Sequence, residues 1–224
     1  MASVLSCRRA ETFFVEPCLP SIAENIERVQ ERIQRACQRS GRPVQDILLI
    51  AVSKTKPADS VRQAHAAGLR VFGENRVQEA AAKRQELNDL DVAWHLIGHL
   101  QSNKAKQACQ LFDVVHSVDS LHLAEKVDRA AAAIERKMPV MIEVHLGEEA
   151  SKFGVEEDNL VLLAEQIGAL PSLELRGLMT LPPFFDDPAS VRPFFRRLRE
   201  LAAHIDTRHL PRVSALCPKP PQLT

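Results

Sequence analysis

Short apolar runs alternate with amphipathic stretches along most of this chain. The apolar runs predict strands that begin near Ile47, Arg70, Asp91, Asp113, Met138 and Leu173. Between and after them, apolar residues recur at helical spacing, which predicts helices over about 59–67, 77–87, 103–109, 121–135, 156–170 and 190–205. One more helix precedes the first strand, because Ser21 and Glu24 form a capping-box pair and Gly41 and Pro43 are typical of a helix end.

The repeated strand–helix order predicts a parallel sheet, either doubly wound or closed as a (β/α)8 barrel. Two features favour the barrel. The chain has only eight glycines and no glycine-rich dinucleotide loop. Polar residues also recur at the carboxyl ends of the predicted strands, where barrels build their sites. These residues are Lys54, Glu74 with Asn75, His99, Asp119, Glu143 with His145, and Thr180.

The strand count is short of a complete barrel, which needs eight strands. From Pro211 on, the sequence PRVSALCPKPPQLT contains four prolines and cannot supply two buried strands and a helix. We therefore expect an α/β barrel with about six βα units, lacking the last two strands. The expected organisation is a disordered extension over 1–20, an incomplete barrel over 21–210 and an aberrant proline-rich tail over 211–224. Open sheet edges in such a barrel predict association through unpaired backbone groups.

Composition excludes several classes of partner. The chain has 29 basic and 29 acidic residues, so no global charge favours nucleic acid or an anionic membrane. No apolar stretch approaches the roughly 20 residues that span a bilayer. The five cysteines are scattered and show no metal-binding spacing, which is typical of a reduced, cytoplasmic protein.

The segment ILLIAVSKTKP at 47–57 carries the main candidate for chemistry. An apolar run of strand length ends in Lys54, and Pro57 suits the first turn of a helix. Burial of Lys54 and repulsion from Lys56 are expected to lower the pKa of Lys54. A lysine of that kind has a free amine for Schiff-base chemistry with an aldehyde. The alternative is a lysine that merely extends from the strand end into water.

Five motifs in order and register resemble one known family. They are IAVSKTKP at 50–57, VFGENRVQE at 71–79, WHLIGHLQSNK at 94–104, SKFG at 151–154 and RGLMTLPP at 176–183. Together they are similar to the pyridoxal phosphate homeostasis proteins, the YggS/PROSC-like family. The likeness covers roughly Ile22 to Leu210, nearly all of the chain that is predicted to fold.

The resemblance implies a barrel of the alanine-racemase N-terminal type that binds pyridoxal 5′-phosphate (PLP). Lys54 would hold the cofactor as a covalent aldimine without catalytic turnover, in the service of intracellular vitamin B6 homeostasis. Asn75 would lie beside the ring, and His95 and Met179 would wall the pocket. Enzymes that accept PLP would be the partners, and the intact family implies a monomer.

Each of these residues has an alternative role. Asn75 also suits the N-cap of the helix that follows it. His95 lies within a predicted buried strand and suits a hydrogen-bonded core histidine, and Met179 suits core packing. Lys104 and Lys152 match family positions at the mouth of the barrel, but they also suit solvated surface lysines.

Other functions remain open at this point. The family's last two strands, which hold the phosphate and face the pyridine nitrogen, have no counterpart here, so the chain is alternatively a degenerate member that no longer binds PLP. A racemase of this barrel type requires a tyrosine and a further β-domain, and the chain has no tyrosine. A Schiff-base aldolase usually carries its lysine on a later strand, whereas the sixth predicted strand ends in Leu178-Met179-Thr180.

Overall fold

A computed structural model describes residues 20–147 and 153–206 of the chain. Six strands form one parallel sheet, in the order in which they occur along the chain. They are β1 (Ala51–Val52), β2 (Val71–Glu74), β3 (Ala93–Leu96), β4 (Val114–Val118), β5 (Met138–Glu143) and β6 (Leu173–Met179). The six predicted strands are thus confirmed. The predicted extension, the tail from Pro211 and Lys152 lie outside the described residues.

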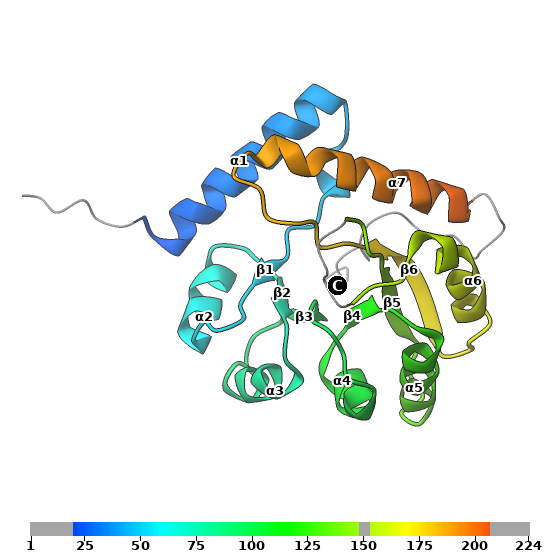
Figure 1. Ribbon diagram of the computed structural model, residues 1–224. Coiled ribbons are helices and arrows are strands. Elements are labelled where there is room, and N and C mark those ends of the chain that lie inside the picture. Colours follow the sequence, from blue (N-terminus) through cyan, green and yellow to red (C-terminus); the bar gives the residue numbers. More distant parts are fainter. Residues whose placement is uncertain (1–19, 148–152, 207–224) are drawn as a thin grey trace, which may run out of the picture.

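Helices follow the strands in the alternation that the sequence predicts. They are α1 (Ile22–Ser40), α2 (Ala58–Ala66), α3 (Val77–Glu86), α4 (Ala105–Leu111), α5 (Leu121–Ala132), α6 (Glu157–Gly168) and α7 (Arg192–Asp206). Short 3-10 helices are η1 (Val44–Asp46), η2 (Ser102–Lys104) and η3 (Pro188–Val191). Figure 1 shows α2 to α6 arranged in succession around the outside of a curved sheet, the arrangement of a (β/α) barrel.

Both predicted ends of α1 are confirmed. The Ser21 backbone N–H donates to Glu24 Oε2 at 2.7 Å, and the Glu24 N–H donates to Ser21 Oγ at 3.2 Å, which completes the capping box. Gly41 takes a φ of 67° and donates its N–H to the Cys37 carbonyl, so the glycine supplies the left-handed residue that closes the helix.

The core lies between the outer face of the sheet and the surrounding helices. The rings of Phe72 on β2 and Trp94 on β3 pack with centroids 5.9 Å apart, and both side chains are buried. Cys109 on α4 is also fully buried, and its Sγ lies 3.7 Å from the Val127 carbonyl of α5. Burial raises the pKa of the Cys109 thiol to about 11. Each large apolar side chain that is fully buried, such as Phe72, contributes about 1.5–3 kcal/mol to the free energy of unfolding.

The first strand is much shorter than the apolar run from Ile47 predicts. Only Ala51 and Val52 pair, with Phe72 and Gly73 of β2. Residues 47–50 pair with no strand among the described residues. Position at the edge of the sheet does not explain this alone, because β6 also has one neighbouring strand and forms seven strand residues. Val52, on this edge strand, is 51% exposed.

The sheet is open within the part of the chain that the structure describes, because β1 pairs only with β2 and β6 only with β5. The helix α7 packs on β6, and Arg197 of α7 binds Glu157 of α6 at 2.6 Å. Of the helices in 20–147 and 153–206, none is long and apolar enough to cross a membrane.

Candidate functional site

Lys54 lies in the turn between β1 and α2. The Lys56 N–H donates to the Ser53 carbonyl at 3.0 Å and closes this turn around Lys54 and Thr55. The prediction that Lys54 is buried is wrong, because the strand ends at Val52 and the turn carries Lys54 into solvent. The Lys54 side chain is therefore accessible to a ligand.

A buried polar network ties this turn to α3. Lys83 Nζ donates to the Ser53 carbonyl at 2.5 Å, to Glu74 Oε1 at 2.7 Å and to Glu79 Oε1 at 3.0 Å. Ser53 Oγ donates to Glu74 Oε1 at 2.6 Å, and the Thr55 N–H donates to Glu79 Oε1 at 2.5 Å. The hydrogen bonds from Lys83 and from the Thr55 N–H lower the pKa of the Glu79 carboxyl.

Asn75 follows β2 and is half-buried. Its Oδ1 is buried and accepts no hydrogen bond from the residues that the structure describes. Arg76 is the residue at the N-cap of α3, and it makes no side-chain cap, so Asn75 does not take the capping role that was its alternative. The chain can pass close to Asn75 because residue 98 is a glycine, since a Cβ there would lie 2.5 Å from the Asn75 carbonyl oxygen. An unpartnered buried acceptor costs about 1–3 kcal/mol, which a ligand that donates a hydrogen bond would recover.

His95 on β3 is a hydrogen-bonded core histidine. Its Nδ1 lies 2.9 Å from Nε2 of His116 on β4, and both side chains are buried. Burial lowers the pKa of His95 to about 4 and that of His116 to about 3. Both rings are therefore neutral near pH 7, and one nitrogen donates while the other accepts. His116 was not singled out from the sequence, where it interrupts the apolar run VVHSV.

A polar cavity of about 360 Å³ lies at the ends of β2 and β3, and Asn75 and Lys104 both line it. His99 lines it as well, and its ring stacks on Phe153 with centroids 3.8 Å apart. The His99 Nδ1 lies 3.5 Å from Asp119 Oδ2, which comes after β4. The structure thus brings together polar residues from three neighbouring strand ends, as predicted for this edge of the sheet.

Met179 is the last residue of β6 and is half-buried. It pairs with Glu143 of β5, and its carbonyl accepts a hydrogen bond from the Val144 N–H at 2.8 Å. Glu143 is buried, and burial, together with repulsion from Asp119, raises the pKa of its carboxyl. No group of three or more acidic, histidine or cysteine side chains in the described ranges is arranged to hold a metal ion.

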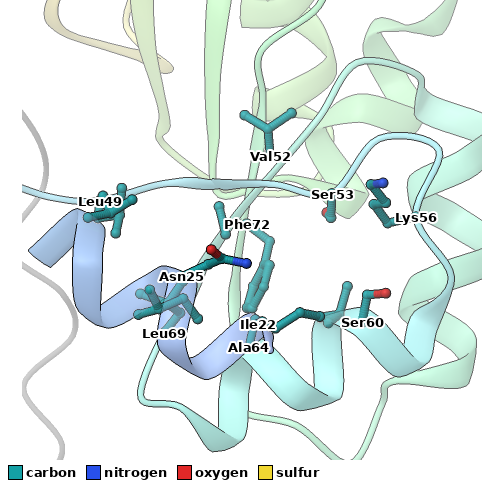
Figure 2. A pocket seen from close by; sticks show the side chains of 14 residues that line it. Ile22, Asn25, Leu49, Val52, Ser53, Lys56, Ser60, Ala64, Leu69 and Phe72 are labelled. Atoms are coloured by element: carbon teal, nitrogen blue, oxygen red, sulfur yellow. The ribbon is translucent and has the colours of Figure 1, made fainter. Parts of the chain in front are cut away.

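A second, apolar pocket of about 390 Å³ adjoins the Lys54 turn between α1, β1 and α2, and Ser53 and Lys56 of the turn line it. Figure 2 shows Leu49 at one end of it and Ser53 and Lys56 at the other. Lys54 does not line this pocket, nor do the other residues that the sequence analysis assigned to the cofactor. The polar candidate residues and the apolar pocket are therefore separate features.

Comparison with known proteins identifies the class of the chain. Residues 19–217 match the model of the family described as the alanine racemase N-terminal domain, so the curved parallel sheet is a barrel of that type. The chain is 47% identical over 183 residues to a pyridoxal phosphate homeostasis protein of Pseudomonas aeruginosa, covering 82% of this chain and 80% of that one. It is 45% identical over 178 residues to the protein of that name from Aquifex aeolicus, covering 80% and 78%. The chain belongs to the pyridoxal phosphate homeostasis protein family.

A solved structure agrees with this assignment. PipY of Synechococcus elongatus, determined with PLP bound, is 42% identical and superposes with a TM-score of 0.71. The match covers 84% of this chain and 83% of PipY. The resemblance on which the sequence analysis relied is thereby confirmed, together with the predicted fold class.

Proposed function

We propose that the protein binds pyridoxal 5′-phosphate and serves the intracellular homeostasis of this vitamin B6 cofactor, holding it without catalytic turnover. Family membership and the PLP-bound PipY structure support the ligand. The observation that carries the proposal is the exposed amine of Lys54, in a turn held on both sides at the carboxyl end of β1. That is where barrels place their functional groups.

Lys54 supplies the covalent bond in this proposal. Its deprotonated Nζ attacks the aldehyde carbon of PLP, a C=N bond forms, and the aldehyde oxygen leaves as water. The bond is reversible, because water or another amine can attack the same carbon and free the lysine. Release to an amine of an acceptor enzyme therefore needs no other catalytic group, and PLP-dependent apoenzymes are the partners that we propose.

Asn75 is the residue that we propose lies beside the ring. Support for this comes from its buried Oδ1, which lacks a hydrogen-bond donor within the described residues. His95 and Met179 are proposed as parts of the pocket wall, which their positions on β3 and at the end of β6 allow. Lys104 lines the same cavity as Asn75 and would add positive charge at the mouth.

The competing hypothesis is a family member that no longer binds PLP. Within the described residues no strand follows β6, so the groups by which barrels of this kind hold a phosphate after their last two strands are not among them. Binding by Lys54 alone would then be weak. This alternative and the carrier hypothesis differ in whether PLP forms a bond to Lys54.

An absorbance titration with PLP distinguishes them. The wild type and a Lys56→Ala control, which alters the neighbouring exposed lysine, are expected to develop a visible band that Lys54→Ala lacks. Borohydride reduction is expected to fix the added mass on Lys54, read by peptide mass spectrometry. Soluble, folded wild-type protein without a Lys54-dependent band would favour the degenerate family member.

We also propose a cytoplasmic location and association through the sheet edges. Cys37 and Cys109 are free thiols, as expected in a reducing compartment.

The β1 edge, with Val52 half-exposed, offers backbone groups to a second chain. Light scattering over a range of concentrations is expected to show self-association that Val52→Lys weakens. A monomer at all concentrations in both proteins would contradict the edge proposal.

A further inference from the structure

Both neighbours of Lys54 in the chain are bound to the same helix. The Ser53 carbonyl accepts from Lys83 Nζ and the Thr55 N–H donates to Glu79 Oε1, each at 2.5 Å. Glu79 and Lys83 stand one turn apart on α3 and also bind each other at 3.0 Å. The backbone on either side of Lys54 is thus fixed by one pair of side chains from outside the turn.

The turn has a backbone conformation that its own residues do not favour. Thr55 has a φ of 62°, in the left-handed region that β-branched residues rarely adopt. Glu135, at a φ of 54°, is the other non-glycine residue with positive φ in the described ranges, and it lies just beyond the end of α5. Strain of this kind persists only where surrounding contacts impose it. At Thr55 two hydrogen bonds impose it: the bond from the Lys56 N–H to the Ser53 carbonyl, which closes the turn, and the bond from the Thr55 N–H to Glu79.

The network is a poor device for stability alone. The side chain of Lys83 is 8% exposed and that of Glu74 is 0% exposed, so both charges have lost most of their hydration. Apolar residues in place of such a buried pair are often as stable or more so. One oxygen of Glu74, Oε2, is buried and has no hydrogen-bond partner in the described part of the chain, which is a further cost. What the network supplies, and apolar side chains would not, is a fixed geometry for the turn.

We propose that Glu79 and Lys83 are positioning residues that hold the Lys54 turn in its strained form so that the amine is presented to an aldehyde ligand. The proposal rests on the proposed function, since it assigns a role in the reaction of Lys54 with PLP. Glu74 serves as the buried counter-charge that keeps Lys83 in place. None of these three side chains is assigned to contact the cofactor.

Glu79 offers the cleanest test because its side chain is 26% exposed, whereas those of Lys83 and Glu74 are almost fully buried. Glu79→Leu removes the acceptor of the Thr55 N–H, and Glu79→Gln retains an oxygen in the same place. Glu86→Leu makes the same change at an exposed site on α3 and is the matched control. Thermal unfolding of the full chain establishes that each variant is folded.

The first readout needs no ligand. Amide hydrogen exchange at Thr55, followed by NMR, is expected to accelerate about tenfold or more in Glu79→Leu, because a charge-assisted hydrogen bond is lost. Glu79→Gln is expected to lie between Glu79→Leu and the wild type, and Glu86→Leu to match the wild type. Unchanged exchange in Glu79→Leu would show that the turn does not depend on Glu79, and would overturn the proposal.

The second readout is the rate at which PLP and borohydride modify Lys54. Glu79→Leu is expected to react about tenfold more slowly than the wild type, and Glu86→Leu at the wild-type rate. Adding Thr55→Asn to Glu79→Leu is expected to restore much of the rate, because asparagine adopts positive φ readily. That rescue separates positioning of the turn from a general loss of stability.

The outcomes also separate this proposal from the proposed function. A wild-type protein in which Lys54 takes up no PLP would overturn both. A wild type that reacts at Lys54, with a folded Glu79→Leu that reacts equally fast, would overturn the positioning role and leave the carrier function standing.

Discussion

The first strand and the middle of the sheet are ordered in different ways. β1 has two residues, and half of the Val52 surface faces solvent. β4 and β5 have five and six residues, with nearly every side chain buried. In the middle, apolar packing fixes the strands and the polar pair His95–His116 is neutral. Beside β1, hydrogen bonds from charged side chains of α3 provide the local order instead.

The difference shows how the fold accommodates a reactive amine. A lysine inside the packed part of the sheet would lose its hydration and could not be reached by a solute. At the thinly covered strand the amine of Lys54 stays accessible, but packing there is too sparse to fix the backbone. The buried charges of Glu74 and Lys83 fix the turn instead, through their hydrogen bonds to Ser53.

The largest expected effect comes from breaking the polar network at its centre. Lys83→Met leaves Glu74 buried without its counter-charge and is expected to lower the free energy of unfolding by about 3–5 kcal/mol. The double variant Glu74→Leu/Lys83→Met removes both charges and is expected to recover most of this stability. Chemical denaturation measures both. If the double variant is as unstable as Lys83→Met, packing rather than charge is what Lys83 contributes.

The same double variant sharpens the comparison between stability and positioning. It restores stability by packing but removes the hydrogen bond from Lys83 to the Ser53 carbonyl, which keeps the bond from the Lys56 N–H. Its Lys54 is therefore expected to react with PLP more slowly than in the wild type, even at equal stability. If the double variant and the wild type react with PLP at equal rates, Lys83 contributes to stability alone and does not position Lys54.

A pair of truncations compares the two regions directly. Ile142→Ala on β5 deletes a fully buried side chain and is expected to cost about 2–5 kcal/mol. Val52→Ala on β1 alters a half-exposed side chain and is expected to cost less than about 1 kcal/mol. Denaturant titration of both variants against the wild type checks the ratio. Similar costs would mean that β1 is packed more tightly than its exposure indicates.

The paired histidines predict a fall in stability with acid. In the unfolded chain both imidazoles bind protons near their ordinary pKa of 6.5, whereas burial holds their folded pKa values at about 4 and about 3. The unfolded state therefore binds more protons than the folded state below pH 6.5. The free energy of unfolding decreases as the pH falls from 6.5 toward the folded pKa values of about 4 and about 3. Denaturant titrations at a series of pH values measure this slope.

His116→Leu is the matched variant for the pH experiment, and it is expected to show a shallower slope. Glu143 changes the free energy of unfolding with pH in the opposite direction. Because burial raises the pKa of its carboxyl in the folded protein, its contribution to stability is lost as the pH rises above the ordinary pKa of a glutamate. That contribution is common to both proteins, so the difference between them isolates the imidazole. Identical slopes would contradict the assignment of neutral buried rings.

The smallest expected effect on stability is that of Asn75→Ala. Removal of the Asn75 Oδ1, which is unpartnered within the described residues, relieves its desolvation cost, while the shorter side chain loses packing contacts. Because these two changes oppose each other, the net change in the free energy of unfolding is expected to be less than about 0.5 kcal/mol. PLP affinity, measured by the absorbance titration, is expected to fall. A large loss of stability with unchanged affinity would identify Asn75 as structural.

Most of the sheet could be predicted because strands buried on both faces leave continuous apolar runs. Met138 and Leu173 begin β5 and β6 where the sequence predicts, and β2 begins at Val71, one residue after the predicted start. The run from Ile47 is equally apolar but forms only two strand residues. How many residues of an apolar run pair with the neighbouring strand depends on the rest of the fold, because β6 is also an edge strand and pairs over its full length.

The candidate site was only partly predictable for a related reason. Lys54 and Asn75 stand next to recognisable strand ends, so the sequence locates them. Glu79 and Lys83 have the i, i+4 spacing of an ordinary exposed ion pair, and their partners in the turn lie 24 and 30 residues away. Their burial follows from how α3 packs on the sheet, which helical periodicity alone does not reveal.

The buried thiol of Cys109 can report how often the packed part of the barrel opens. Its pKa near 11 and its full burial keep the thiolate, the form that reacts, almost absent in the folded protein. An alkylating reagent can therefore reach Cys109 only while α4 and α5 are apart. In a variant whose other cysteines are serine, the labelling rate counts openings of the packed half of the barrel, and adding PLP would show whether a ligand held at one edge slows them.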